Sequence, residues 1–164
     1  MLRDDLILRT RLVPPRLHRL TLARPALLAR LADALDARCT IVHAGTGYGK
    51  STALAAFVAH APGRPVAWYS LSEADTDPQR FLAYLIAAFR SRFPSLSDLP
   101  HAILQDVGQG AGAHHWAQVV DALINALAER IDRATLLVLD DYHFVSQTPA
   151  IAALTERFIS NAPA

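Results

Sequence analysis

The chain has 164 residues, of which 52% are hydrophobic and 19% charged, and this composition is typical of a folded globular domain. A formal net charge of +1 excludes a strong overall attraction to nucleic acid or to a membrane surface. A single cysteine excludes an internal disulfide, and the longest apolar run, at 81–89, is too short for a bilayer-spanning helix. Because the N-terminus also lacks a signal-peptide pattern, we expect a cytoplasmic protein without a membrane partner.

The first half of the chain predicts an arm followed by alternating helices and strands. Residues 1–24 are rich in arginine and contain a diproline, which disfavours a helix, so we expect an N-terminal arm there and a domain over 25–164. The patterns after the arm predict, in order, a helix over 25–37, a strand over 39–44, a helix over 50–61 and a strand over 65–71. Cys39, at the start of the first strand, is expected to be a small core residue.

The second half continues this alternation. Asp77 and Pro78 are residue types that begin helices, and the segment after them is apolar on nearly all sides, so we expect a helix enclosed in the core. The predicted elements are a helix over 78–93, a short helix near 99–107, a helix over 114–132, a strand ending at 140 and a helix over 149–160. Apolar strands separated by helices predict an α/β fold with a mainly parallel sheet.

The stretch AGTGYGKS, residues 44–51, matches the pattern of a phosphate-binding loop, with alanine in the first position. Glycines let backbone N–H groups approach a phosphate closely, and a helix that begins near Lys50 directs its positive end at the same anion. The expected nucleotide-binding residues are Ala44, Gly45, Thr46, Gly47, Tyr48, Gly49, Lys50, Ser51 and Thr52. An ordinary glycine-rich turn is the alternative, whereas a Rossmann fingerprint is excluded because lysine occupies the position of its third glycine.

Lys50 is the only lysine among 16 basic residues, so we expect it to do something that arginine cannot. An ammonium group is a compact charge on a flexible stem, which suits it to the β- and γ-phosphates of ATP. The Ser51 hydroxyl is expected to bind Mg²⁺, and the Thr52 N–H to face the α-phosphate. We therefore predict ATP or ADP with Mg²⁺ as the ligand, and a catalytic role for Lys50.

Two carboxylates follow the apolar run LLVL at 136–139. An acidic residue at the end of a strand is the second half of such a nucleotide site, because it holds the shell of the magnesium ion. Asp140 is the expected metal-site residue, and Asp141 is the candidate catalytic base that activates water. The alternative is a strand that simply leaves the core through a polar loop.

Four stretches in this order resemble the nucleotide-binding domain of the large ATP-dependent LuxR-type transcription regulators, a group of signal-transduction ATPases. They are TRLVPPRLHRLTLARPALLARL, HAGTGYGKST, VAWYSLSEADTDPQRFLAYLIAAF and LLVLDDYHFV. The resemblance implies a three-layer sandwich of the P-loop NTPase class, and a switch between an ADP-bound resting state and an ATP-bound multimer, reset by slow hydrolysis. It also implies that Arg16, in VPPR, lies near the adenine and ribose, and that His143 lies close to the phosphates.

The resemblance also sets expectations about the rest of such a regulator. In the family, a strand with a sensor of the γ-phosphate follows this region and lies between the glycine-loop strand and the LLVLDD strand. We therefore expect a partial domain, truncated before the sensor strand, whose ability to hydrolyse ATP stays open. The implied partners are the nucleotide and the regulator's remaining domains, or a second copy that pairs with exposed strand edges. DNA would bind only through a C-terminal domain absent from this chain.

Other interpretations start from the residues alone. A P-loop kinase for a small molecule would need arginine-rich acceptor and lid segments after the last strand, where the chain ends. A non-catalytic interaction fragment would keep the motifs without closing around ATP. Eight of the fifteen arginines precede Cys39, but they are scattered without aromatic residues between them, which disfavours a nucleic-acid-binding arm. The seven histidines lack the spacing of a zinc site.

Overall fold

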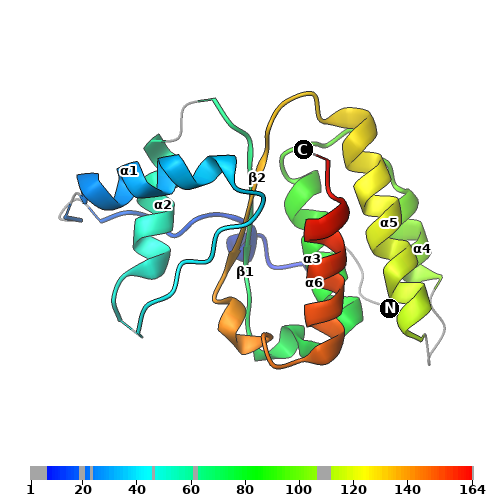
Figure 1. Ribbon diagram of the computed structural model, residues 1–164. Helices are drawn as coiled ribbons and strands as arrows, with labels where there is room; N and C mark the ends of the chain where they lie inside the picture. The colour runs from blue at the N-terminus through cyan, green and yellow to red at the C-terminus, as the bar shows by residue number, and fades with distance from the viewer. Residues whose placement is uncertain are drawn as a thin grey trace. The chain divides into compact units, whose positions relative to one another are not determined.

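The computed structural model describes residues 7–18, 21–22, 24–45, 47–60, 63–106 and 112–163 (Figure 1). Its α-helices are α1 (Pro25–Asp33), α2 (Lys50–His60), α3 (Pro78–Arg90), α4 (Leu99–Gln105), α5 (Ala113–Arg130) and α6 (Pro149–Asn161). Its strands are β1 (Val66–Ser70) and β2 (Leu136–Asp140), and its short 3₁₀ helices are η2 (Arg9–Leu12), η3 (Ala34–Asp36), η4 (Glu73–Thr76) and η5 (Tyr142–Phe144). Every helix in the described ranges falls short of the length or the apolarity that a membrane span requires.

The chain divides into two compact units. The core unit comprises residues 1–13 and 65–164, and the glycine-loop unit comprises residues 14–64. The chain therefore crosses between the units twice, after Val13 and after Arg64. The division into an arm over 1–24 and a domain over 25–164 stays a prediction from the sequence.

The sheet confirms the predicted α/β fold with parallel strands. β1 pairs with β2 in parallel, in a register that runs from Val66 opposite Leu136 to Ser70 opposite Asp140. Four of the five β1 side chains are buried, as expected for a strand whose sequence is apolar without alternation. This arrangement brings the carboxyl ends of both strands to the same edge of the sheet.

The predicted strand over 39–44 was wrong. These residues form no strand, and the side chain of Ile41 is 86% exposed. Cys39 is exposed as well, so its expected place in the core was also wrong. The physical reason is that an extended segment becomes a strand only with a hydrogen-bonded neighbour, and β1 and β2 pair only with each other in the described part of the chain.

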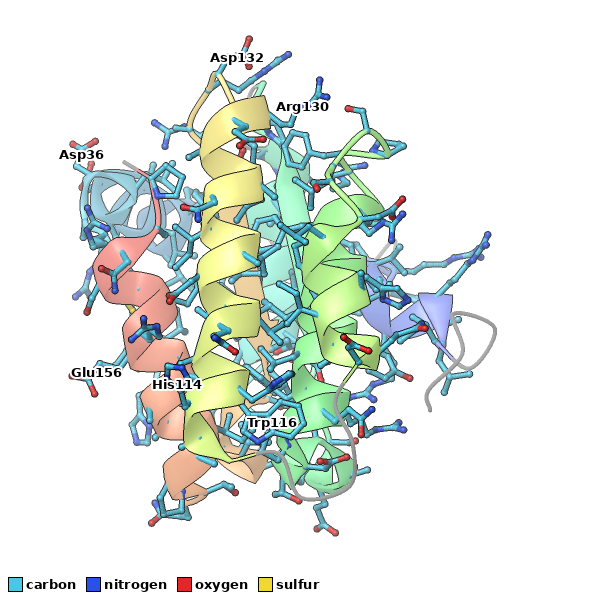
Figure 2. The ribbon with its side chains drawn as sticks, turned by 90° about the vertical axis from the view of Figure 1, so that its right-hand side faces the viewer. Asp36, His114, Trp116, Arg130, Asp132 and Glu156 are labelled. Carbon is cyan, nitrogen blue, oxygen red and sulfur yellow. The ribbon has the colours of Figure 1, made fainter. Side chains whose placement is uncertain are left out.

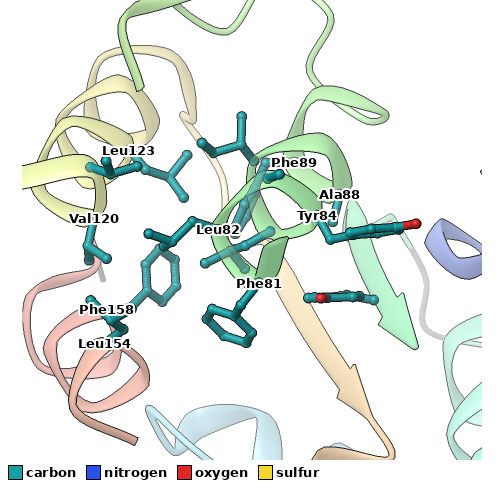
Figure 3. Close-up of a cluster of buried hydrophobic side chains, with 14 of the residues drawn as sticks. Phe81, Leu82, Tyr84, Ala88, Phe89, Val120, Leu123, Leu154 and Phe158 are labelled. Atoms are coloured by element: carbon teal, nitrogen blue, oxygen red, sulfur yellow. The ribbon is translucent and has the colours of Figure 1, made fainter. Parts of the chain in front are cut away.

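Helix α3 forms the centre of the core unit, as its apolar sequence predicts. The Asp77 carboxylate accepts a hydrogen bond from the Gln79 N–H (3.2 Å), which caps the first turn, and Pro78 occupies the adjoining position. Eight of the thirteen α3 residues are buried. Figure 3 shows its side chains between β1 on one side and α5 and α6 on the other, with Phe89 facing Phe158 at a ring distance of 5.8 Å.

Helices α4, α5 and α6 complete the core unit. Helix α5 contacts both α4 and α6, and its buried side chains recur along one face. Trp116, near the start of α5, is half-buried against the hydrophobic core (Figure 2). An exposed ion pair between Arg157 and Asp121 joins α6 to α5, with two bonds of 2.6 Å.

The glycine-loop unit buries fewer large side chains. Helices α1 and α2 contact each other, and their buried residues are Leu31, Ala53, Ala55 and Phe57. Pro25 begins α1, as predicted, and a 3₁₀ turn carries the helix on to Asp36. Helix α2 matches its predicted span closely, and it positions the residues described next.

Candidate nucleotide-binding site

The glycine loop immediately precedes α2. Gly47 and Gly49 have φ angles of 79° and 75°, a left-handed conformation that is accessible to glycine without steric cost. An added Cβ at either position would meet no atom within 4 Å, so glycine is required there by conformation and not by crowding. Lys50 begins α2, and the Ala53 N–H donates to the Gly49 carbonyl (2.9 Å) in its first turn. The segment GYGK therefore forms a tight turn that leads directly into a helix N-terminus.

The Lys50 side chain curls back across this loop. Its Nζ donates to the carbonyls of Ala44 (2.9 Å) and Gly45 (3.0 Å). An ammonium group has three N–H donors, so these two bonds orient it without saturating it by themselves. Arg24 Nη1 donates to the Tyr48 carbonyl (3.4 Å), which ties the start of α1 to the same loop. These hydrogen bonds hold the loop around the ammonium group of Lys50.

The other residues predicted for the loop are placed as follows. Thr46 lies outside the described residues. Tyr48 is 70% exposed, and Thr52 is exposed on the first turn of α2. Ser51 is half-buried beside Lys50. Arg16, in the same unit, is exposed. Apart from Thr46, the predicted phosphate-binding residues therefore lie in the loop and in the first turn of α2, with Arg16 elsewhere in that unit.

Asp140 ends β2 in the core unit. Its carbonyl accepts a hydrogen bond from the Leu71 N–H (2.9 Å), which extends the ladder one step beyond β1. The residue is only 6% exposed, so it has not left the core at the point where the strand ends. A carboxylate in such a place needs compensating interactions, because burial of a charged group is costly.

Asp141 has the opposite environment from its neighbour. Its backbone is left-handed (φ 59°, ψ 33°), and among the described residues it is the only one other than glycine with a positive φ. Its side chain is 39% exposed and lies 3.8 Å from His143 Nδ1, measured from Oδ1. The Phe144 N–H donates to the Asp141 carbonyl (3.1 Å) as η5 begins. The chain therefore changes at the left-handed Asp141 from a buried carboxylate, that of Asp140, to one that reaches solvent.

Asp75 is a buried carboxylate that the sequence does not single out, because it lies within the polar stretch SEADTDP. It is fully buried in η4 and accepts two bonds from the Arg11 guanidinium, at its two oxygens. Arg80 Nε donates to Oδ1 (3.1 Å), and the N–H and hydroxyl of Ser72 donate to Oδ2 (2.7 and 3.0 Å). The charge pattern gives no signal for this network, because Arg11 is one of many arginines in the arm.

The network changes the proton affinity of its members. Burial by itself raises the pKa of Asp75, but hydrogen bonds from Arg11 and Ser72 outweigh burial and leave that pKa below its usual value. Desolvation raises the pKa of the Tyr69 hydroxyl, and the negative charge of Asp75 raises it further. Asp75 is therefore an ionised carboxylate at neutral pH, and Tyr69 is a neutral phenol beside it.

Comparison with known proteins finds matches that cover most of the chain. Residues 33–162 match the family model described as "AAA domain". The chain is 34% identical over 128 residues to an HTH-type transcriptional regulator MalT of Serratia proteamaculans. It is 31% identical to the MalT of Yersinia enterocolitica and 33% identical to that of Yersinia pestis, over 128 and 129 residues. These matches confirm the resemblance to LuxR-type regulators.

The matched region is most of this chain but a small part of each regulator. Each covers 77% of this chain but only 13% of the regulator, so the chain spans about an eighth of the length of the relatives it matches. The family model spans most of the chain, including the glycine loop, Asp140 at the end of β2 and Asp141 after it. The chain therefore belongs to the AAA domain family, as a P-loop domain related to the nucleotide-binding region of MalT regulators.

Proposed function

We propose that this chain is the ATP/ADP-binding switch module of a longer LuxR-type transcription regulator, binding Mg-nucleotide and hydrolysing ATP slowly. The observation that carries the proposal is the turn through Gly47 and Gly49 that leads into α2 at Lys50. Such a turn presents backbone N–H groups and a helix N-terminus to an anion, and the ammonium group supplies the matching charge. A phosphate chain is the ligand that this combination suits best.

Ser51 and Asp140 are the residues we assign to magnesium. Mg²⁺ keeps several waters and commonly takes only one or two protein oxygens besides those of the phosphates, so a hydroxyl and a carboxylate are a sufficient set. The burial of Asp140 fits this role, because a buried carboxylate is stabilised by a nearby cation. When bound, the ion would neutralise negative charge on the phosphates.

Asp141 is the candidate base for hydrolysis. Its side chain is partly exposed while its neighbour is buried, so it can reach a water molecule that Asp140 cannot. Its carboxylate would accept a proton from the attacking water. The water oxygen would bond to the γ-phosphorus while the bond from that phosphorus to the β–γ bridging oxygen breaks, so that ADP leaves and inorganic phosphate forms. We assign to Lys50 the catalytic role of stabilising charge on the phosphates. We assign Arg16 to the adenosine end of the ligand.

The wider role follows from the relatives. They are named HTH-type transcriptional regulators, and this chain matches a small part of each. We infer that nucleotide binding here controls contacts with the remaining domains of a regulator or with a second copy, and that another region binds DNA. ATP in place of ADP is the signal that would favour the multimer.

Thermal unfolding with and without Mg-ADP or Mg-ATP tests the nucleotide site. A ligand at 100 times its dissociation constant should stabilise the parent chain by about 2.7 kcal/mol. Lys50→Ala should lose most of this ligand-induced shift. Lys50→Arg should lose much of it too, because a planar guanidinium does not fit where a compact ammonium does. Arg30→Ala, which removes an exposed charge from α1 in the same unit, is the matched control and should keep the full shift.

The two nucleotides and the control separate the outcomes. A larger shift with ADP than with ATP would identify the ADP-bound state as the preferred one for this chain. A cooperative transition that neither nucleotide moves would reject the proposed function and favour an interaction module. An equal loss in Arg30→Ala would mean that net charge, and not the loop, determines binding.

A further inference from the structure

The backbone just beyond β1 supports the acidic end of β2, and both belong to the core unit. The Leu71 N–H donates to the Asp140 carbonyl (2.9 Å). The next residue, Asp141, is left-handed and begins the turn into η5. Helix η4, which follows Leu71 closely in the chain, contacts η5 as well. The segment from Leu71 to η4 is therefore the neighbour against which Asp140 and Asp141 are placed.

Leu71 lies between two residues that are bonded to the same pair of side chains. The Ser70 carbonyl accepts from Arg11 Nε (2.8 Å), and the Ser72 N–H donates to Asp75 Oδ2 (2.7 Å). The terminal nitrogens of Arg11 bond both oxygens of Asp75, which joins the two side chains. This pair thus fixes the backbone on both sides of Leu71. We refer to the four bonded residues, Arg11, Ser70, Ser72 and Asp75, as the Leu71 bracket.

The Leu71 bracket is built from buried, charged groups. Asp75 is fully buried, and only 14% of the Arg11 side chain is exposed. The Arg11 guanidinium also lies over the Tyr84 ring, 4.5 Å from its centroid, which restricts its rotation. Hydrogen bonds between ionised groups are stronger than those between neutral groups, and the donors of arginine lie on three separate nitrogens at fixed angles. Arg11 can therefore hold a backbone carbonyl and a carboxylate in one fixed arrangement.

Arg80 separates two functions of the network. Its Nε donates to Asp75 (3.1 Å), and its guanidinium lies 5.1 Å from the Tyr84 centroid. In the described part of the chain, however, no hydrogen bond joins Arg80 to the backbone of residues 70–72. Arg80 thus balances the charge of Asp75, whereas Arg11 balances that charge and also holds the end of β1. The two arginines provide a matched pair of substitutions.

We propose that Arg11 and Asp75 are positioning residues, which hold Leu71 so that the acidic end of β2 keeps the placement that ATP hydrolysis needs. This inference rests on the proposed function, in which Asp140 belongs to the magnesium site and Asp141 is the base. It adds two residues that act only through other residues of the core unit. Because a displacement of about 1 Å can lower a rate about a hundredfold, loss of the bracket should lower kcat.

Hydrogen exchange of the Leu71 amide, measured by NMR on the full chain without ligand, tests the structural half of the proposal. Arg11→Met should speed this exchange at least about tenfold, the factor that corresponds to the loss of one hydrogen bond to a charged group. Arg80→Met is the matched control and should stay within about twofold of the parent. Circular dichroism spectra and melting curves accompany each variant. If Arg11→Met does not fold, Arg11→Lys keeps the charge, loses the three separate donors, and should speed exchange by a smaller factor.

ATP hydrolysis and ADP binding test the functional half. Folded Arg11→Met and Asp75→Asn should lower kcat about ten- to hundredfold. The dissociation constant of metal-free ADP, measured in EDTA, should change less than about twofold, because the glycine loop is untouched and the loss concerns only the reaction. Arg80→Met should keep both parent values. A general loss of structure would weaken ADP binding along with kcat, so the split between the two distinguishes positioning from stability.

The outcomes are separable. Unaltered Leu71 exchange in folded Arg11→Met would overturn the bracket, and faster exchange with an unaltered kcat would overturn its role in hydrolysis. Equal losses of kcat in Arg11→Met and Arg80→Met would overturn the proposal by assigning the effect to the charge balance of Asp75. A parent chain that binds ADP without hydrolysing ATP would overturn the positioning role and leave nucleotide binding intact. A parent that does neither would refute the proposed function itself, while Leu71 exchange would still decide whether the bracket holds the strand end.

Discussion

Asp75 contributes stability that depends on pH. Because its pKa is lowered in the folded protein, this contribution falls as the solution becomes more acidic. The native carboxylate holds its proton less tightly than the unfolded one, whose pKa is about 3.9. Its contribution is therefore fully present above that unfolded value and is lost as the pH falls through the native value. This contribution of Asp75 does not decline above neutral pH, because the two arginines that bond it stay charged.

We expect Asp75→Asn to flatten the acid side of the stability profile. Urea unfolding of the parent from pH 7 to pH 3 should give a free energy that declines in the acid range, and Asp75→Asn should decline less, from a lower starting value. Asp132→Asn, which alters a carboxylate with 90% side-chain exposure, is the control and should keep the parent profile. Identical slopes for the parent and Asp75→Asn would contradict an ionised Asp75.

Asp141 combines a backbone constraint with a proposed chemical role, and three substitutions separate them. Left-handed backbone costs most residues about 1–2 kcal/mol, whereas glycine and asparagine tolerate it. Asp141→Asn should therefore fold with near-parent stability but lose ATP hydrolysis. Asp141→Gly should fold well and lose hydrolysis too, while Asp141→Ala should be destabilised by about 1 kcal/mol. Urea midpoints measure stability, and phosphate release measures ATP hydrolysis. Equal stability of the alanine and asparagine variants would show that the left-handed backbone at residue 141 imposes no strain.

At the scale of the elements, α3 carries the core unit. Figure 3 shows Leu82 on the side of α3 that faces the labelled side chains of α5 and α6, and Leu82 is fully buried. Its neighbours belong to different elements, so the space that it fills cannot close by the movement of one helix. The cost of a cavity at this position should therefore fall at the upper end of the usual range.

We predict that Leu82→Ala lowers the free energy of unfolding by about 3–5 kcal/mol. Leu99→Ala is the matched control, because it removes the same atoms from α4 at a position that is 57% exposed. It should cost less than about 0.5 kcal/mol, as surface substitutions usually do. Denaturant titration of both variants measures the difference. Similar losses from both would mean that α3 is not the centre of the core unit.

The segment over 39–44 illustrates what an element needs beyond its own sequence. Its β-branched residues Thr40, Ile41 and Val42 favour a strand, as the valine and the two aromatic residues of β1 do, yet only β1 becomes one. The difference is a partner: β1 has β2 beside it in parallel register, and residues 39–44 have none in the described part of the chain. Strand propensity is thus realised only when a neighbouring backbone satisfies its N–H and C=O groups.

At the scale of the whole molecule, the two units differ in how much they bury. The large buried side chains gather in the core unit, whereas the glycine-loop unit buries only a few. A unit with fewer buried side chains needs less free energy to open locally, so the glycine-loop unit should open before the core unit does. Arg38 lies exposed in a segment of that unit without regular structure, which makes the following peptide bond accessible to a protease.

We expect trypsin to cut the native chain first after Arg38. Mg-ADP should slow this cut in the parent, because a ligand that binds the closed form reduces the population of the open one. Lys50→Ala should be cut at the same rate with and without the nucleotide. Mass spectrometry of the first fragments identifies the site. A first cut after Arg90 or Arg130, within the core unit, would contradict the assigned difference between the units.

The sequence by itself determined the local features whose cause lies within a few residues. The helix N-termini at Pro25 and Pro78 follow from proline and capping geometry, and the turn into α2 follows from the glycines that precede Lys50. The parallel α/β class follows from apolar strands alternating with helices. All of these depend on neighbours along the chain, so a pattern of residues is sufficient to predict them.

Only the tertiary structure decided the features that depend on distant partners. Whether residues 39–44 form a strand depends on a neighbouring strand, and whether Cys39 is buried depends on the same neighbour. Asp75 became a buried, ionised carboxylate because Arg11, 64 positions earlier, reaches it in the fold. The physical reason is common to these cases: hydrogen-bond satisfaction and burial are properties of groups brought together in space, and residues far apart in the sequence carry no local sign of meeting.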